Sequence, residues 1–297
     1  MLIAVTGASG FIGSALTESL KDEGHDVLSV GRSSGDIIWN PAIGEIDAEK
    51  LEGVEAVVHL AGENIASRRW TEKQKKRILE SRVEGTKLLS RTLANLSKPP
   101  SVLLSGSAIG IYGSRDDEEL TEDSAKGSGF LSDVVDKWEK STSEASEAGI
   151  LVTHLRTGLV QSPNDGMMKK TLPLFKLGLG GKLGSGSQYW SWISLEDEVR
   201  LITWLLTAGL AGPVNLTAPI PVTNLEFTKS LGRAINRPTF FPVPMLGPKL
   251  LLGRELASEL IENSARVIPQ RAIENGFEFK HVDLDTSLPE ILSIKNG

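Results

Sequence analysis

The chain has 297 residues, of which 40% are hydrophobic and 24% charged, a composition typical of a globular protein with a sizeable core. Its net charge of −6 excludes the broad basic face that nucleic-acid binding requires. Cysteine is absent, which excludes disulfides, thiolate zinc sites and cysteine nucleophiles, and the four widely spaced histidines predict no metal site.

The chain shows no pattern of a membrane span or an export signal. The longest apolar segment, residues 201–214, is interrupted by threonines, glycines and a proline, and it is shorter than the ~20 residues of a membrane helix. No basic leader precedes the apolar residues at the start. We therefore expect a cytoplasmic protein with no membrane partner and no nucleic-acid partner.

Strand and helix patterns alternate through the first half of the chain. Short apolar runs predict strands, and amphipathic spacing predicts helices. The strands are expected at 2–5, 26–30, 56–60, 101–104 and 150–155, and the helices at 11–23, 72–96 (with Thr71 as N-cap) and 131–148. This alternation predicts an α/β fold, a doubly wound parallel sheet of the Rossmann type with helices on both faces.

The pattern changes after about residue 162. Glycines crowd residues 178–186, prolines cluster at 238–244, and a helix at 250–265 and a strand at 277–279 are expected beyond them. We expect residues 1–162 to form one Rossmann domain. Residues 163–297 would form a smaller substrate-side region, with a return to the first domain around 187–217.

A glycine-rich turn follows the first predicted strand. Gly7 permits the tight turn, Gly10 lets the backbone approach a pyrophosphate, and Gly13 allows close packing of helix on strand. The helix that follows presents free N–H groups and a positive dipole end to phosphates. The residues expected to contact a dinucleotide here are Gly7, Ser9, Gly10, Phe11, Ile12 and Gly13.

The end of the second predicted strand indicates which dinucleotide binds. An acidic residue that would hold the ribose 2′-hydroxyl of NAD is missing, and Gly31 stands in its place. Arg32 and Ser33 follow, and a guanidinium suits a 2′-phosphate because it is always charged and donates paired hydrogen bonds. We expect NADP(H); the alternative is an exposed loop arginine.

Six segments carry recognisable motifs: Thr6–Gly13, His59–Gly62, Leu104–Gly113, Leu155–Val160, Trp192–Asp197 and Pro242–Leu292. The first five resemble the extended short-chain dehydrogenases/reductases, the class of nucleotide-sugar epimerases and dehydratases. The last is similar to a domain of unknown function that closes one subfamily, the atypical "epimerase family" proteins, some of which bear a cell-division-inhibitor label. The resemblance implies further cofactor contacts at Leu60, Ala61, Gly62 and Ser105.

The same comparison shows departures among the residues that carry out proton transfer in the family. The family's Tyr-x-x-x-Lys motif is absent: Phe130 or Leu131 stands at the tyrosine position, and Val134 or Val135 at the lysine position. Other residues differ from the family pattern as well: Arg82 replaces an asparagine and Ser194 replaces a histidine.

Three residues remain as catalytic candidates. Ser107 keeps the position of the family's active-site serine, with strand-end hydrogen bonding as the alternative. Tyr112 could donate a proton if a cation lowered its pKa, and the alternative is a packed aromatic with a satisfied hydroxyl. Glu63 follows the His59–Gly62 turn and would place a carboxylate at the nicotinamide end of the cleft.

Three further residues are candidates for substrate contact. Asn64 lies beside Glu63, Arg156 at a strand end could hold an anionic group or form a structural ion pair, and Trp192 could line the cleft or pack in the core. His59, inside an apolar strand, is expected to be a hydrogen-bonded core residue.

The cofactor-binding motifs are intact, whereas the family's proton-transfer residues are replaced. This combination defines the expected function. We expect an NADP(H)-dependent oxidoreductase or nucleotide-sugar-epimerase-like enzyme, with a non-standard site, that acts on a small hydroxy or carbonyl compound. The alternative is an NADPH-binding redox sensor or scaffold with little catalysis, or a cell-division-related interaction protein. Either would be a monomer or a homodimer, the latter through the helices at 72–96 and 131–148.

Overall fold

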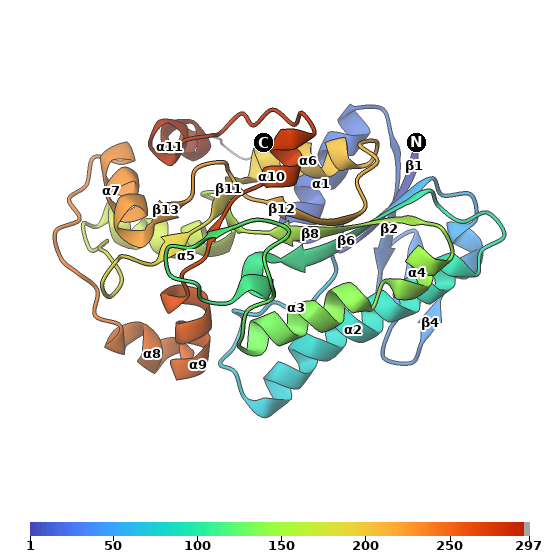
Figure 1. Ribbon diagram of the computed structural model, residues 1–297, viewed down its shortest axis with the longest axis horizontal. Coiled ribbons are helices and arrows are strands. Elements are labelled where there is room, and N and C mark those ends of the chain that lie inside the picture. The colour runs from blue at the N-terminus through green and yellow to red at the C-terminus, as the bar shows by residue number, and fades with distance from the viewer. Residues whose placement is uncertain (294–297) are drawn as a thin grey trace.

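An eight-stranded sheet forms the centre of the computed structural model, which describes residues 1–293 (Figure 1). Neighbouring strands are parallel except for β3 and β4. In spatial order the strands are β12 (Gly212–Leu216), β8 (Leu151–Thr157), β6 (Val102–Ala108), β5 (Ala56–His59), β1 (Leu2–Thr6), β2 (Asp26–Gly31), β3 (Ile37–Asn40) and β4 (Glu45–Ile46). The predicted doubly wound sheet is confirmed, and the strand order reverses between β1 and β5, where such sheets bind ligands.

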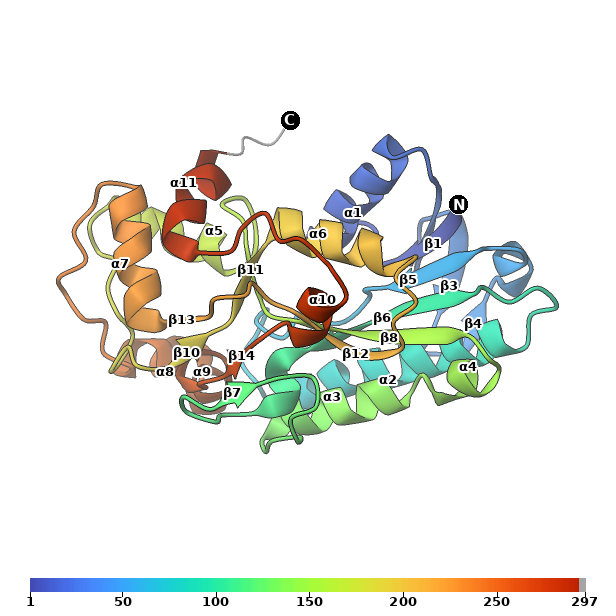
Figure 2. The same ribbon diagram turned by 45° about the horizontal axis from the view of Figure 1, so that its top comes forward.

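Helices cover both faces of the sheet (Figure 2). One face carries α2 (Glu72–Ala94), α3 (Phe130–Lys140) and α4 (Ser143–Glu147); the other carries α1 (Phe11–Asp22), α6 (Leu195–Leu205) and α10 (Gln270–Glu274). Alternation along β1 serves both layers, because Ile3 and Val5 pack with the α1–α6 core and Ala4 with the α2–α4 core. The predicted N-cap of α2 is confirmed: Thr71 Oγ1 accepts a hydrogen bond from the Gln74 N–H at 3.2 Å.

The later part of the chain builds a second core around Trp192 and Leu288. Its helices are α5 (Gly166–Lys176), α7 (Asn224–Ala234), α8 (Leu246–Leu252), α9 (Arg254–Ala257) and α11 (Leu284–Ser293). Two small strand pairs join it to the first part: β7 (Glu119–Leu120) with β14 (Arg266–Val267), and β9 (Leu159–Gln161) with β11 (Trp192–Ser194). A third pair, β10 (Tyr189–Trp190) with β13 (Val222–Thr223), lies within the later part. Short η1 (Ala48–Leu51), η2 (Ile109–Tyr112) and η3 (Ser258–Glu262) complete the elements. Among the residues described, no helix has both the length and the apolar character needed to cross a bilayer.

Two predicted helices are interrupted. The expected helix at 131–148 divides into α3 and α4, because Ser141 and Thr142 turn their hydroxyls onto the carbonyls of Lys137 and Glu139. The expected helix at 250–265 breaks at Gly253, whose φ of +92° lies outside the helical region.

The predicted strand at 277–279 is wrong. Phe277 and Phe279 instead pack edge to face with ring centroids 4.8 Å apart, and Phe277 also lies 5.6 Å from Trp204 of α6. The apolar spacing that suggested a strand therefore reflects aromatic packing of an irregular segment onto a helix.

Candidate functional site

The turn between β1 and α1 has the geometry of a phosphate cradle. Gly7 has a φ of +70°, and a Cβ on Gly13 would lie 2.1 Å from the Gly7 carbonyl oxygen, so a side chain at 13 does not fit. Gly10 is the N-cap of α1 and supplies no side-chain hydrogen bond. Ser9 and Gly10 are exposed, and Phe11 and Ile12 are half-buried. The first N–H groups of α1 are therefore open to an anionic ligand.

A second tight turn follows β2. A Cβ on Gly31 would lie 1.9 Å from the Ser34 carbonyl oxygen, so this position also requires glycine. The carboxylate of Asp36 accepts hydrogen bonds from the Ser29 N–H at 2.8 Å and the Ser29 hydroxyl at 2.7 Å, which lower its pKa. Arg32 is exposed, and within residues 1–293 its guanidinium has no hydrogen bond or ion pair. The nearby acid is thus engaged within the protein, and the arginine is not.

The turn after β5 is fastened to the glycine-rich turn. Thr6 Oγ1 accepts hydrogen bonds from the N–H groups of Leu60 and Ala61, both at 3.1 Å. The His59 ring contacts Thr6 Oγ1 at 2.7 Å and Thr86 Oγ1 at 2.9 Å. His59 is fully buried, and burial lowers its pKa to about 4. The prediction of a hydrogen-bonded core histidine is confirmed.

Arg82 of α2 lies directly behind this turn. Its Cζ would be 3.4 Å from a Cβ on Gly62, its Nη1 donates to the carbonyls of Glu63 at 3.0 Å and Ile78 at 3.2 Å, and its Cζ stands 5.0 Å from the centroid of the Trp138 ring. Burial lowers the pKa of Arg82 to about 10. No carboxylate among the described residues is within ion-pair distance of it.

Sequence reasoning registered Arg82 only as a departure from a family pattern. The available signal was the position itself, since residue 82 is an arginine where the family pattern has an asparagine. The structure adds that the Arg82 side chain is half-buried, lies against the Trp138 indole and forms no ion pair within residues 1–293, although the charge of Glu63 acts on it.

Glu63 and Asn64 lie on the same turn. The Glu63 carboxylate is half-buried and accepts a hydrogen bond from Gln74 Nε2 at 3.3 Å, while its N–H donates to Ser81 Oγ at 3.1 Å. Asn64 is exposed, and its Oδ1 accepts from the Ala66 N–H at 2.8 Å. Glu63 is therefore positioned by two residues of α2, Gln74 and Ser81.

Ser107, Tyr112 and Arg156 form one buried network with Glu139. The Ser107 hydroxyl donates to Glu139 Oε1 at 2.6 Å, and Arg156 donates to both Glu139 oxygens at 2.9 and 3.0 Å. The Tyr112 hydroxyl donates to Asn215 Oδ1 at 2.7 Å and accepts from Arg156 Nη1 at 2.9 Å. Each polar group of this network is satisfied inside the protein.

Two of these residues adopt the structural alternative that the sequence left open. Tyr112 is fully buried, and burial raises its pKa to about 12 against the opposing effect of Arg156. Arg156 forms an ion pair with Glu139 whose two side chains are 9% and 13% exposed. Burial raises the pKa of Glu139, but hydrogen bonds from Arg156 and its charge outweigh this and hold the pKa below the ordinary value.

Two residues of the predicted contact set lie in the interior. Trp192 of β11 is fully buried and its Nε1 donates to the Ile220 carbonyl at 3.0 Å, so the indole packs in the second core, which is the alternative stated for it. Ser105 is also fully buried inside β6, with its hydroxyl directed at the Gly106 carbonyl.

A cavity of about 350 Å³ lies where the segment after η2 meets the C-terminal region. Its walls combine serine hydroxyls with carboxylates and exposed backbone. They include Ser114, Asp116, Gly184, Ser187, Glu262 and Ser264. Such a lining suits a small polar ligand.

Two known families match the chain in succession. The "NAD dependent epimerase/dehydratase family" matches residues 3–217, and a "domain of unknown function" matches residues 243–291. The first match covers every strand of the central sheet and the turns described above.

Individual relatives extend over nearly the whole chain. The "epimerase family protein Mb2239" of Mycobacterium bovis is 43% identical over 292 residues, which is 97% of this chain and 96% of that protein. The human "epimerase family protein SDR39U1" is 36% identical over 299 residues, 99% of this chain and 100% of that protein.

Solved structures show the same likeness. The crystal structure of the human SDR39U1 protein (isoform 2) with NADPH superimposes with a TM-score of 0.89 at 34% identity, covering 98% of this chain and 99% of that one. A nucleoside-diphosphate sugar epimerase of Corynebacterium glutamicum gives a TM-score of 0.81 at 33% identity, with 98% of this chain and 58% of that chain covered.

Proposed function

The chain belongs to the NAD dependent epimerase/dehydratase family, and from this premise we propose that it is an NADP(H)-dependent oxidoreductase or epimerase-like enzyme with a non-standard active site. The membership confirms the resemblance indicated by its glycine-rich turn and its C-terminal segment. The name "epimerase" describes the family and leaves the reaction of this chain to its own residues.

The α1 N-terminus carries the proposal. Gly7, Gly10 and Gly13 leave a backbone cradle that any Cβ would narrow or fill, and Gly10 caps the helix without using its N–H groups. Such an arrangement accepts a pyrophosphate through backbone hydrogen bonds and the helix dipole. The human relative crystallised with NADPH supports the same assignment for this chain.

Arg32 supports the phosphorylated form of the cofactor. Its exposed, unpaired guanidinium at the end of β2 can pair with a 2′-phosphate, and the Ser33 hydroxyl lies next to it in the chain. Asp36, the next acidic residue along the chain, accepts hydrogen bonds from Ser29 instead of offering those oxygens to a ribose. When bound, the nicotinamide would supply or accept the hydride.

Glu63 and Arg82 take the chemical roles at the turn after β5. We assign to Glu63 the carboxylate that accepts or returns a substrate proton, because it is half-buried and forms no ion pair within residues 1–293, although its charge acts on Arg82. Arg82 supplies the positive charge that stabilises an oxyanion or an anionic substrate group. Ser107 and Tyr112, held by Glu139 and Asn215, position the strand ends on which the site rests.

The cavity at Ser114 and Glu262 is the proposed substrate side. Its hydroxyls and carboxylates suit a small hydroxy or carbonyl compound. The C-terminal region supplies one wall, since Ser264 and Glu262 meet Ser114 and Asp116 there. Membership in the family and this polar lining together support a small-molecule substrate.

Turnover tests the proposal. Purified protein is incubated with NADPH and a panel of aldehydes and ketones, and with NADP⁺ and the matching alcohols, while absorbance of the reduced cofactor is followed. The proposal expects activity with at least one compound, with kcat reduced about 10²–10⁴-fold in Glu63→Gln. Glu80→Gln, an exposed carboxylate of α2, is the matched control and leaves kcat unchanged.

One observation favours a second function. The hydroxyls of Ser107 and Tyr112 are both hydrogen-bonded within a buried ion-pair network, so neither is free to contact a substrate. This is expected of a chain that binds NADPH and signals its redox state without turnover. Under this alternative, NADPH binds with full affinity while no panel compound oxidises it. Glu63→Gln then leaves cofactor affinity and every other readout unchanged.

A further inference from the structure

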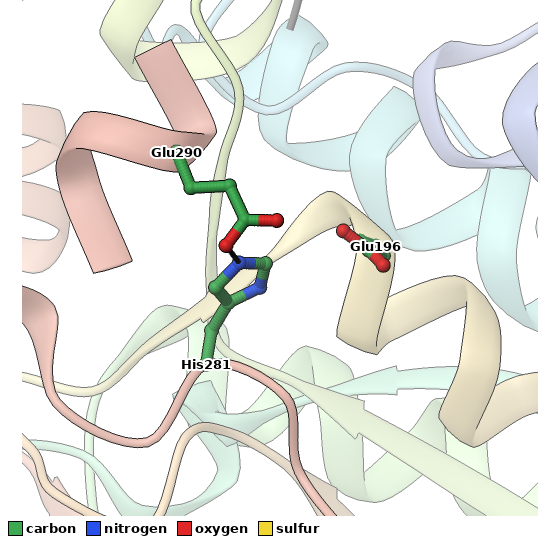
Figure 3. A group of neighbouring side chains, drawn as sticks. All are labelled: Glu196, His281 and Glu290. Carbon is green, nitrogen blue, oxygen red and sulfur yellow. Dashed lines mark ion pairs between the residues drawn. The ribbon is translucent and has the colours of Figure 1, made fainter. Parts of the chain in front are cut away.

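Three potential metal ligands meet outside the turns described above. Glu196 in the first turn of α6, His281 in the segment before α11 and Glu290 of α11 place one ligand atom each within 4.8 Å of one another (Figure 3). The spacing of the four histidines along the chain indicated no metal site. The fold creates this group by laying the last helix beside the N-terminal end of α6.

The buried nitrogen of His281 provides an independent observation at this cluster. The His281 side chain is 2% exposed, and its Nε2 is buried without any hydrogen-bond partner. Figure 3 shows the ring edge aimed at Glu290, whose Oε2 lies 3.5 Å from Nε2. An orphaned buried nitrogen is costly, and here it faces carboxylate oxygens that cannot donate to it.

The other ring nitrogen of His281 is held from outside the cluster. Nδ1 lies 2.8 Å from Ser194 Oγ, which also accepts the Asp197 N–H, and 3.8 Å from the fully buried Asp197 carboxylate. Nε2 is therefore the ring nitrogen that faces the carboxylates of the cluster. A metal-binding histidine has the same arrangement, with its second nitrogen held by an outer hydrogen bond.

Charge at the cluster is only partly balanced by the protein. Lys280 Nζ contacts Glu196 at 2.9 Å and Glu290 at 2.6 Å, which places one positive charge against two carboxylates. The Lys280 side chain is 40% exposed, so it can move into solvent. Glu196 and Glu290 are 35% and 51% exposed and can rotate inward.

We propose that Glu196, His281 and Glu290 bind one divalent transition-metal ion of the Zn²⁺ class, which displaces the Lys280 ammonium. Zn²⁺ takes histidine nitrogen and carboxylate oxygen at about 2.0–2.2 Å, and water fills the remaining position. The ion satisfies the orphaned nitrogen and neutralises both carboxylates. The bound ion thereby links α11 to α6, which joins the C-terminal region to one of the helices that cover the main sheet.

Zn²⁺ binding to the tag-free full chain tests the proposal. Metal-depleted protein is titrated with ZnCl₂ by calorimetry, and its melting temperature is measured with and without the ion. We expect one Zn²⁺ per chain, a higher melting temperature with zinc, and affinity about tenfold higher in Lys280→Met, which removes the competing ammonium. His281→Asn retains a polar group beside Ser194 but lacks Nε2, and it loses at least tenfold in affinity.

A matched pair of variants on α11 separates a built site from surface binding. Glu290→Gln removes a ligand and weakens binding about tenfold or more, whereas Asp285→Asn removes an acid paired with Arg233 outside the cluster and leaves binding unchanged. Equal affinity in Glu290→Gln and Asp285→Asn would overturn the proposal. So would the absence of saturable zinc binding in Lys280→Met, which would leave a protonated His281 as the partner of Glu290.

Discussion

The β1–α1 turn and the carboxyl ends of β6 and β8 lie in the same sheet but are built in opposite ways. At the turn, backbone N–H groups and the Arg32 guanidinium are left without partners inside the described part of the chain. Near the ends of β6 and β8, Ser107, Tyr112 and Arg156 form hydrogen bonds with one another, with Glu139 and with Asn215.

This difference separates binding from chemistry. Unpaired donors at a helix N-terminus are useful only if a ligand completes them, whereas a closed ion-pair network stabilises the fold and offers little to a substrate. The reactive groups of this chain therefore lie on the turn after β5, where Glu63 and Arg82 remain incompletely paired.

The closed network should dominate stability. Glu139→Ala leaves the Arg156 guanidinium buried without its carboxylate, and the free energy of unfolding should fall by about 3–5 kcal/mol in urea denaturation. Glu144→Ala breaks the exposed pair with Arg91 and should cost less than about 1 kcal/mol. Similar losses in both variants would remove the distinction between the two regions.

The open turn should dominate cofactor affinity. Gly13→Ala would place a Cβ 2.1 Å from the Gly7 carbonyl oxygen and distort the cradle. NADPH should bind about 100-fold more weakly, or ~2.8 kcal/mol, in a fluorescence titration. Gly247→Ala, where a Cβ meets no atom within 4 Å, is the control, and equal affinity in the two variants would contradict the cradle.

Glu198 extends the comparison to α6. It is fully buried, and burial raises its pKa to about 8 although Thr157 donates a hydrogen bond to Oε1 at 2.8 Å. Between the ordinary pKa of 4.5 and about 8, the unfolded chain releases a proton that the folded chain keeps, so stability falls as pH rises.

Glu198→Gln should remove this slope, which is at most about 1.4 kcal/mol per pH unit. The measurement is the free energy of unfolding from pH 5 to 8 in both proteins. Parallel pH profiles would show that Glu198 ionises in the folded chain.

Arg32 should give the smallest effect because it is exposed. Arg32→Ala should weaken NADPH binding about fivefold, or ~1 kcal/mol, and leave NADH binding unchanged. Arg77→Ala makes the same change of charge on the exposed face of α2. A loss that is equal for the two cofactors would assign Arg32 no role at the 2′-phosphate.

Local patterns were sufficient to predict the sheet and the cofactor turn. Gly7, Gly10 and Gly13 indicate a phosphate-binding turn only because a strand precedes them and a helix follows them. Both elements can be recognised from a few neighbouring residues. Thr71 likewise predicts the start of α2, because an N-cap hydroxyl bonds to the backbone within one helical turn.

Long-range contacts lay beyond those patterns. The pairing of Arg156 with Glu139, the burial of Trp192 and the orphaned Nε2 of His281 each depend on segments far apart in the chain. Arg82 was visible as a substitution, but its stacking on Trp138 required the packing of α2 against α3. The interruption of the predicted helix 250–265 at Gly253 was also missed, because the residues on both sides of it have helical spacing.

Titration of the cofactor-free chain with NADPH and with NADH, followed by energy transfer from tryptophan to the nicotinamide, tests the central claim most directly. The account predicts saturable binding of both, with NADPH several-fold tighter because only it carries the phosphate that Arg32 can pair with. If neither NADPH nor NADH bound, the account would be contradicted, because the free N–H groups of the β1–α1 turn would then have no dinucleotide ligand.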